Sequence, residues 1–434
     1  MDPHIKKFLA GYLRGRKTFV EFRNKKSKRR KMRQGVPQGG VLSPLLFNLY
    51  MATIPLPPAP MRLVSYADDC TIIISGPKIL PLCTELNAYL NTLNNWFLER
   101  NLHISPTKSS ATVFTTFSNE MSIQLPIYIN NTLVPTEKHP KILGTTLDPK
   151  LNFGQHVKLT KDKVTKKNFI LKSLAGTTWG TSKEILLTTF KAISKSVLSY
   201  CAPIWSPNLS KTNWNELQVA QNFGLKTSLG CVRNTDVGHI HAESKILPVK
   251  EHCEMIAKQF LLSTQQPIHP SFNDDLSTPP RIMSNTLSTE YMHDVAHLVK
   301  EGGNDRATHK TGLITLHTTA VQSYISSAPH NKVLNAPPPE IHAEEKSLPR
   351  RTRSVLSQLR SGYSSFLNAY MHRINKAPSP DCPKCGHPSH DTHHLFECPQ
   401  NPTSLQVIDL WMKPKETATF LELDNGDARE EDPG

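Results

Sequence analysis

Residues 35–51 read GVPQGGVLSPLLFNLYM and, after a proline-rich spacer, residues 62–74 read RLVSYADDCTIII. The first segment predicts a glycine-rich turn that leads into a helix, with Ser43 as the N-cap and Pro44 in the first helical position. Glycines let the backbone bend and approach another chain closely, and here they are Gly35, Gly39 and Gly40. Four leucines at helical spacing predict one buried face on that helix: Leu42, Leu45, Leu46 and Leu49.

The second segment predicts a hairpin with apolar strands and the residues Tyr66-Ala67-Asp68-Asp69 at its turn. Asp is common in turns, which explains one of the two adjacent carboxylates well. The alternative is that Asp68 binds a divalent cation, because hard oxygen ligands suit Mg²⁺ and two ions about 4 Å apart can hold the attacking and leaving oxygens of a phosphoryl transfer. A YADD sequence alone is weak evidence, but its position after the glycine-rich block makes the metal-binding interpretation strong.

The block PQGGVLSPLLFNLY followed by SYADD resembles the palm of reverse transcriptases from non-LTR (LINE-type) retrotransposons, most of all the jockey-like group. The resemblance implies RNA-directed DNA synthesis with Mg²⁺ or Mn²⁺, in which Asp68 is a catalytic metal ligand and Asp69 supports it. It also implies that Gln38, Gly39 and Tyr66 lie against the template and the incoming deoxynucleotide. Without the flanking motif, Gln38 would be read as a loop residue that bonds to the backbone.

Two later segments resemble further parts of the same palm. In residues 102–117, LHISPTKSSATVFTTF, Lys108 matches a family lysine that acts as general acid toward the leaving pyrophosphate. A surface lysine on a loop is an equally good interpretation of Lys108. In residues 141–147, KILGTTL, Gly144 would permit the close backbone approach with which the family grips the primer terminus.

The chain departs from the family at one point. These reverse transcriptases carry another metal-binding aspartate upstream, in a stretch resembling AFDTV, and here the only carboxylate before Glu21 is Asp2, in a different context. We therefore expect the chain to be the C-terminal portion of such an enzyme, a fragment that is inactive alone because the two-metal mechanism needs both aspartates. The alternative is a polymerase-dead remnant that binds RNA or DNA. A recruited host protein with a scaffold role has no support in the sequence.

The charge of the chain favours a polyanionic partner. The formal net charge is +15 over 434 residues with a pI near 9.4, although charge alone does not separate nucleic acid from acidic lipid. Eight of the eleven residues from Arg23 to Arg33 are basic, which fits a solvated hairpin tip better than a nuclear-localisation signal. Eight scattered or clustered cysteines and no long apolar run predict a reducing compartment, cytoplasm or nucleus, and no membrane span.

The motif order predicts an α+β chain. We expect a partial palm with an antiparallel sheet in 1–150, a helical thumb in 151–265, a linker with short helices in 266–350, a helix and zinc knuckle in 351–415, and an acidic disordered tail in 416–434. One short linker helix is expected near Tyr291–Lys300. The thumb helices are expected at Val164–Leu174, Lys183–Tyr200, Trp214–Leu229 and Val249–Leu262. Lysines along the first of them would track a nucleic-acid backbone: Lys158, Lys161, Lys163, Lys166, Lys167 and Lys172.

Residues 381–399 hold a second motif. Cys382, Cys385, His393 and Cys398 give the spacing C-x₂-C-x₇-H-x₄-C, and three thiolates with one imidazole satisfy tetrahedral Zn²⁺ as a structural site. His394 competes for the fourth position, and three coincidental cysteines remain the weaker alternative. The same kind of knuckle follows the polymerase in the family, where it would contact template RNA or target DNA. The expected partners are therefore an RNA template, a DNA primer or target, and deoxynucleotides.

Overall fold

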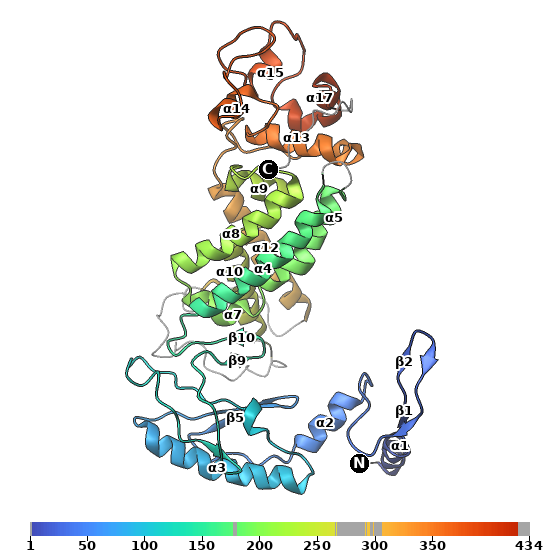
Figure 1. Cartoon of the computed structure of the whole chain (residues 1–434), viewed down its shortest axis with the longest axis vertical. Helices are drawn as coiled ribbons and strands as arrows, with labels where there is room; N and C mark the ends of the chain where they lie inside the picture. Colours follow the sequence, from blue (N-terminus) through green and yellow to red (C-terminus); the bar gives the residue numbers. More distant parts are fainter. Residues whose placement is uncertain are drawn as a thin grey trace. The chain divides into compact units, whose positions relative to one another are not determined.

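The computed structural model describes residues 2–176, 180–264, 266, 291, 293–295, 298 and 306–423. They form two units, one of residues 1–113 and 122–138 and one of residues 114–121 and 139–434 (Figure 1). Helices and small antiparallel sheets occur together, so the predicted α+β class is confirmed. The division differs from the expected boundary at residue 150, because the segment from His139 onward belongs to the second unit.

The first unit begins with α1 (Pro3–Leu13), which Asp2 caps by accepting from the backbone N–H of His4 at 2.7 Å. A long hairpin follows, in which β1 (Lys17–Thr18) pairs with β4 (Arg30–Lys31) and β2 (Glu21–Phe22) pairs with β3 (Lys25–Lys26). Arg23 and Asn24 form the turn with φ angles of +47° and +64°. The prediction that the basic run is a hairpin tip is thus confirmed.

Helix α2 (Ser43–Met51) corrects two expectations. Ser43 is the first helical residue and not the N-cap. Its hydroxyl donates to the carbonyl of Pro37 in the preceding turn and does not accept a hydrogen bond from a backbone N–H of the helix. The predicted buried face is also wrong, since Leu45 and Leu49 are 57% and 51% exposed. The leucines have the helical spacing of a buried stripe, but no apolar partner covers them within the described part of this unit.

Strands β5 (Arg62–Tyr66) and β6 (Asp69–Ile73) form the expected hairpin, which packs on α3 (Ile79–Glu99). The apolar stripe of α3 lies in the core, with Tyr89, Leu90, Leu93 and Trp96 buried. Asn87 of α3 joins the hairpin of β7 (Tyr128–Ile129) and β8 (Thr132–Leu133), because its side chain accepts from the N–H of Tyr128 and donates to the carbonyl of Pro126, both at 2.8 Å.

The expected palm sheet is not formed among the described residues. Every sheet there has two strands, and most strands are two residues long. Each pair of strands belongs to one hairpin. Strands of two residues leave few backbone N–H and C=O groups free to pair with a strand of another hairpin. The structure thus places the sequence motifs on hairpins and helices of a first unit without a continuous sheet beneath them.

The second unit starts with the hairpin of β9 (Lys141–Ile142) and β10 (Thr145–Thr146). Helix α4 (Gly154–Leu174) follows, ten residues longer at its start than predicted, because the carboxylate of Asp148 accepts from the N–H groups of Asn152 and Phe153 at 3.1 and 2.6 Å and fixes the turn into the helix. α4 packs along α8 (Lys211–Leu229). Asn168, fully buried on α4, donates to the carbonyl of Ala220 at 2.8 Å and fastens the pair.

The other helices of the bundle surround this pair. The predicted helix from Lys183 is present as α5 with a π-helical turn and a last helical turn, and α8 and α10 are close to prediction. Trp205 and Trp214 are buried core residues, and Trp179 lies outside the described residues. The elements are α5 (Lys183–Phe190), η2 (Lys191–Lys195), α6 (Ser196–Leu198), α7 (Ala202–Trp205), η3 (Ser206–Asn208), α9 (Val237–Ser244) and α10 (Val249–Thr264).

The region expected to be a linker contains a long helix. α12 (Arg306–Ser327) is 22 residues long and packs on α10, and the described residues within Tyr291–Lys300 are helical as predicted. The single helix expected ahead of the knuckle in 351–415 is two helices, because Gly362 with φ +72° ends α13 (Arg350–Ser361) before α14 (Asn368–Arg373). Left-handed glycine is a common helix terminator.

The C-terminal helices share one apolar core with α13. Leu356, Leu359, Leu410, Trp411 and Ala418 are buried together there. The prediction of a disordered tail from residue 416 is therefore wrong for its first residues, which belong to a packed helix. Residues 424–434 lie outside the described part. The elements are η4 (Ala343–Ser347), α15 (His394–Glu397), α16 (Asp409–Met412) and α17 (Pro414–Phe420). None of the helices searched, all in the described part, is long and apolar enough to cross a membrane.

Candidate active site and metal centre

The YADD residues lie at the tip of the β5–β6 hairpin. Tyr66 pairs with Asp69, so Ala67 and Asp68 form a two-residue loop. Ala67 has φ +53°, a left-handed conformation that costs a residue with a side chain about 1 kcal/mol or more. A strained residue beside two carboxylates is typical of a site whose geometry serves function rather than stability alone.

The two faces of this hairpin have different surroundings. Successive side chains of a strand point to opposite faces, so Leu63 and Ile72 share one face, and Ile72 packs into the core with α3. The other face carries Val64, Tyr66 and Ile73, which are 56%, 66% and 52% exposed. Asp68 and Asp69 are exposed as well. The carboxylates are thus held on a fixed hairpin and remain accessible to a ligand.

The chemistry of the turn fits a divalent cation in part. Asp68 and Asp69 supply adjacent carboxylate oxygens, which are suitable ligands for Mg²⁺. Within the described ranges, however, the only group of three or more metal-binding side chains lies near the C-terminus, so no third ligand joins these two. Burial raises the pKa of the neighbouring Cys70 thiol, and the Asp69 and Asp68 carboxylates raise it further, so this thiol stays protonated.

The glycine-rich turn behaves as the sequence predicts. Gly35 and Gly39 have φ angles of +75° and +81°, and a Cβ on Gly40 would lie 2.5 Å from the Tyr12 hydroxyl. Gln38 and Gly39 are exposed in this turn. The guanidinium of Arg16 donates to the carbonyls of Gln34 and Gly35 and ties the turn to the basic hairpin.

The remaining predicted palm residues fall in different units. Lys108 lies exposed at the end of a short 3-10 turn, η1 (Pro106–Lys108), in the first unit. Gly144 belongs to the second unit and has φ +90°. A Cβ at this position would lie 3.1 Å from the ring of Tyr200, which is a tight contact. The Tyr200 hydroxyl donates to the carbonyl of Leu143 at 2.7 Å. The close approach predicted for Gly144 therefore occurs, and its partner in this structure is Tyr200.

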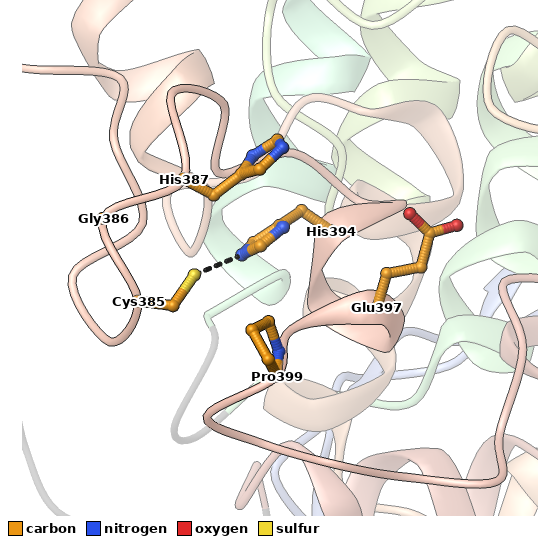
Figure 2. A pocket seen from close by; sticks show the side chains of 6 residues that line it. All are labelled: Cys385, Gly386, His387, His394, Glu397 and Pro399. Carbon is orange, nitrogen blue, oxygen red and sulfur yellow. Dashed lines mark hydrogen bonds between the residues drawn. The ribbon is translucent and has the colours of Figure 1, made fainter.

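The cysteine and histidine motif folds into a loop and a short helix, α15. The N–H of Gly386 donates to the carbonyl of Cys382 at 2.9 Å, and Gly386 has φ +74°. The carboxylate of Asp391 accepts from the N–H of His394 at 3.0 Å and fixes the start of α15. Figure 2 shows the loop and helix around a hollow of about 340 Å³. Its lining residues are Cys385, Gly386, His387, His394, Glu397 and Pro399.

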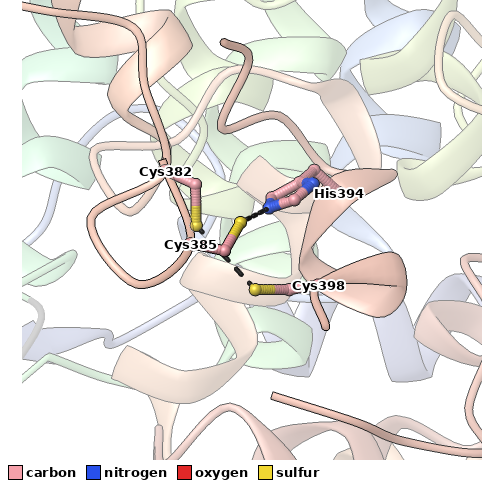
Figure 3. Close-up of side chains that lie close together, drawn as sticks. All are labelled: Cys382, Cys385, His394 and Cys398. Atoms are coloured by element: carbon pink, nitrogen blue, oxygen red, sulfur yellow. Dashed lines mark hydrogen bonds between the residues drawn. The ribbon is translucent and has the colours of Figure 1, made fainter. Parts of the chain in front are cut away.

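Four potential metal ligands converge in this segment (Figure 3). One ligand atom each from Cys382, Cys385, His394 and Cys398 lies within 4.8 Å of all the others. The sulfur atoms of Cys382 and Cys398 are 3.9 Å apart, and that of Cys385 is 3.2 Å from His394 Nε2. Tetrahedral zinc with bonds of about 2.3 Å would place its sulfur ligands about 3.8 Å from one another. The donor set and its spacing fit Zn²⁺.

The structure corrects the choice of His393. His394 and Cys398 are four residues apart, which brings their side chains to the same side of α15, whereas His393 lies one residue before the helix and does not share this spacing. His393 is exposed and its Nε2 lies 2.8 Å from the carbonyl of Val333. The spacing around the cluster is therefore C-x₂-C-x₈-H-x₃-C.

The surroundings of Cys382 favour its deprotonated form, the thiolate. Burial alone would raise the pKa of Cys382, but the N–H groups of Cys385 and Lys384, together with His394, lower it to about 6. His387 stacks on His394, with ring centroids 4.3 Å apart. A deprotonated cysteine and a neutral histidine are the states that bind zinc.

A buried charge network was not expected from the sequence. Lys183 of α5 lies 2.8 Å from Glu243 of α9 and 3.2 Å from Glu345, and Arg360 of α13 contacts both glutamates. Hydrogen bonds that His239 makes with Cys231 and with the Glu243 carboxylate outweigh burial and raise the pKa of His239 to about 9. Lys183 and Glu345 are 162 residues apart in sequence, so no local spacing signals their contact.

Residues 1–147 match the family model described as reverse transcriptase (RNA-dependent DNA polymerase), a span that includes the glycine-rich turn and Asp68. These residues are therefore similar to the reverse transcriptase family, and the match covers about a third of the chain. Curated relatives from mobile elements, jockey among them, are similar to the chain over a longer span, so the resemblance to a LINE-type reverse transcriptase is confirmed.

Three curated relatives define this similarity. The chain is 30% identical over 260 residues to a probable RNA-directed DNA polymerase from transposon BS of Drosophila melanogaster, covering 56% of the chain and 27% of that protein. It is 29% identical over 252 residues to the corresponding protein of the X-element from the same organism, covering 56% of the chain and 26% of the relative. The RNA-directed DNA polymerase of the mobile element jockey from Drosophila funebris is 23% identical over 271 residues, covering 60% and 29%. The matched region thus spans between a quarter and a third of each relative.

Proposed function

We propose that the chain is part of an RNA-directed DNA polymerase of a non-LTR retrotransposon, with Asp68 as metal ligand and Asp69 in support. The observation that carries the proposal is the reverse transcriptase match over residues 1–147, which contains an exposed pair of carboxylates at the tip of a rigid hairpin. The strained Ala67 beside them supports a functional turn.

Each predicted residue has a role in nucleotidyl transfer, in which a primer 3′-hydroxyl attacks the α-phosphate of a deoxynucleotide and pyrophosphate leaves. Magnesium or manganese bound at the turn would supply a Lewis acid for the phosphate oxygens. Gln38, Gly39 and Tyr66 would contact the template and nucleotide, and Lys108 would donate a proton to the leaving pyrophosphate. Gly144 would lie against the primer end.

The chain supplies only part of the ligand set that this reaction needs. A two-metal site requires carboxylates from more than one strand, and in the described residues Asp68 and Asp69 have no third partner. We therefore propose that the 434-residue chain alone does not polymerise, and that a further carboxylate must complete its site.

The alternative function is nucleic-acid binding without synthesis. Four lysines on α4 are exposed and would contact phosphates, namely Lys158, Lys163, Lys166 and Lys172. The cysteine and histidine cluster would bind Zn²⁺ through Cys382, Cys385, His394 and Cys398. Beside it, the hollow next to the exposed His387 would accept an unstacked base.

Primer extension on an RNA template with Mg²⁺ tests these proposals, using the whole chain, Asp68→Asn, and Asp162→Asn as a control that removes an exposed charge from α4. We expect no extension, together with template binding that weakens steeply as salt rises. Extension that Asp68→Asn abolishes and Asp162→Asn preserves would contradict the incomplete site. Extension that survives Asp68→Asn would contradict the metal-ligand assignment itself.

A further inference from the structure

The basic hairpin of residues 14–33 is a built β-ribbon rather than a loose charged loop. Besides its two ladders, the N–H of Ser27 donates to the carbonyl of Val20 and the N–H of Met32 to that of Arg16, both at 2.9 Å. Thr18 pairs with Arg30 and Glu21 with Lys26, so two residues on one strand face three on the other, which is a β-bulge. Every residue from Lys17 to Arg33 is exposed.

This ribbon concentrates the positive charge of the chain. Residues 14–33 hold eleven lysines and arginines and one acid, Glu21, for a net charge of +10, whereas the whole chain carries +15. Glu21 offsets only Lys26, at 3.6 Å. The ribbon is therefore the strongest local source of positive potential that the sequence contains, and a polyanion is the ligand that it would attract.

Aromatic rings hold several cations in place on the ribbon. Lys26 Nζ and Arg29 Cζ lie 5.5 and 5.9 Å from the ring centroid of Phe19, and Arg23 Cζ lies 5.3 Å from that of Phe22. Phe22 is 69% exposed, although a folded hairpin gains little from presenting such a ring to water. The rings and the cations together form a surface that a partner could cover.

We infer that this ribbon binds the major groove of double-stranded DNA. Its strands lie about 5 Å apart, and with their side chains they match a B-form major groove about 12 Å wide, which admits a two-stranded ribbon. The major groove of A-form RNA is too deep and narrow for this. An import receptor binds an extended peptide, whereas the backbone here is already paired in ladders. The inference deepens the nucleic-acid binding proposed above and rests on it, but it concerns a separate surface.

The test compares two triple variants of the whole chain with the same net charge of +12, reached by removing three positive charges from +15. The ribbon variant carries Lys25→Gln, Lys28→Gln and Arg30→Gln, which differ from the three cations that lie over the rings of Phe19 and Phe22. The control carries Lys211→Gln, Lys310→Gln and Lys346→Gln, which are exposed on α8, α12 and η4. Circular dichroism verifies that both variants are folded.

Binding is measured by fluorescence anisotropy with a 20-base-pair DNA duplex, an RNA duplex of the same sequence, and an RNA template annealed to a DNA primer. We expect the ribbon variant to bind the DNA duplex on the order of 100-fold more weakly at 0.15 M salt, with a salt slope lower by about 2.7, because three phosphate contacts are lost. The control should match the unmodified chain.

Three results overturn the inference. Unchanged DNA affinity in the ribbon variant does so, whether or not the ribbon then binds a nuclear import receptor. An equal loss of affinity for the RNA duplex would mean that the ribbon binds phosphates in general. An equal loss of DNA affinity in the control variant would mean that net charge alone explains the effect. Primer–template binding that fails in the unmodified chain would contradict the proposed function, while the DNA result would still decide the ribbon.

Discussion

Arg360 is the residue on which the buried charge network of the second unit depends. Its side chain is fully buried, and its guanidinium contacts Glu243 and Glu345 and donates to the carbonyl of Leu410 at 3.0 and 2.6 Å. Burying charges costs free energy that only good pairing offsets. Every hydrogen-bond or ion-pair partner of Arg360 is itself buried. Removal of Arg360 would therefore leave two buried carboxylates with fewer positive partners.

We therefore predict that Arg360→Met lowers the free energy of unfolding by about 3–5 kcal/mol, since methionine fills the volume but leaves Glu243 and Glu345 short of a counter-ion. Urea unfolding followed by tryptophan fluorescence measures this change. Lys245→Met, which breaks an exposed ion pair with Glu340, is the matched control and should leave the midpoint where it is. If Arg360→Met lowers the free energy of unfolding by less than about 1 kcal/mol, then Lys183 and Arg353 neutralise both carboxylates without Arg360.

At the scale of single elements, the sequence predicts what local spacing controls. The β5–β6 hairpin, the α3 stripe and the left-handed Gly35 and Gly39 follow from alternation, helical periodicity and turn chemistry. The exposed leucines of α2 and the separate hairpins do not follow, because burial depends on partners distant in sequence. The network around Arg360 was missed for the same reason.

The choice between two adjacent histidines shows the same limit. Spacing rules allow either residue, whereas the structure depends on where α15 begins, and Asp391 determines that by accepting from the N–H of His394. Helical geometry then turns His394 toward Cys398 and leaves His393 beside the carbonyl of Val333.

We predict that His394→Ala lowers the bound zinc from one ion per chain to well below one, because a ligand is lost, while His393→Ala keeps the full ion. Purified chain analysed by inductively coupled plasma mass spectrometry gives the stoichiometry. The pair is its own control, since both variants remove one imidazole from neighbouring positions. Zinc lost from His393→Ala and kept in His394→Ala would reverse the assignment.

At the scale of the whole molecule, the cluster is part of a larger packed region rather than an isolated knuckle. Leu395 and Phe396 of α15 lie in the same core as Leu356 and Trp411, and the hydroxyl of Thr392 donates to the carbonyl of Leu359 at 3.1 Å. The charge network then joins α13 to α5 and α9. The cluster therefore does not depend on the metal alone for its fold, because it shares a core with α13 and α16.

Removal of the metal should consequently loosen the cluster without unfolding the helices. We predict that a zinc chelator increases hydrogen exchange in residues 380–400, where the four ligands lose the ion that joins them and only short turns remain, while α13 and α8 keep their protection through Leu359, Arg360 and the α4 contact. Hydrogen exchange read by mass spectrometry follows each segment, and His394→Ala without chelator should give the same pattern. Lost protection in α8 would make the metal a condition for folding the whole unit, and unchanged exchange in 380–400 would mean that the apolar core alone holds the cluster.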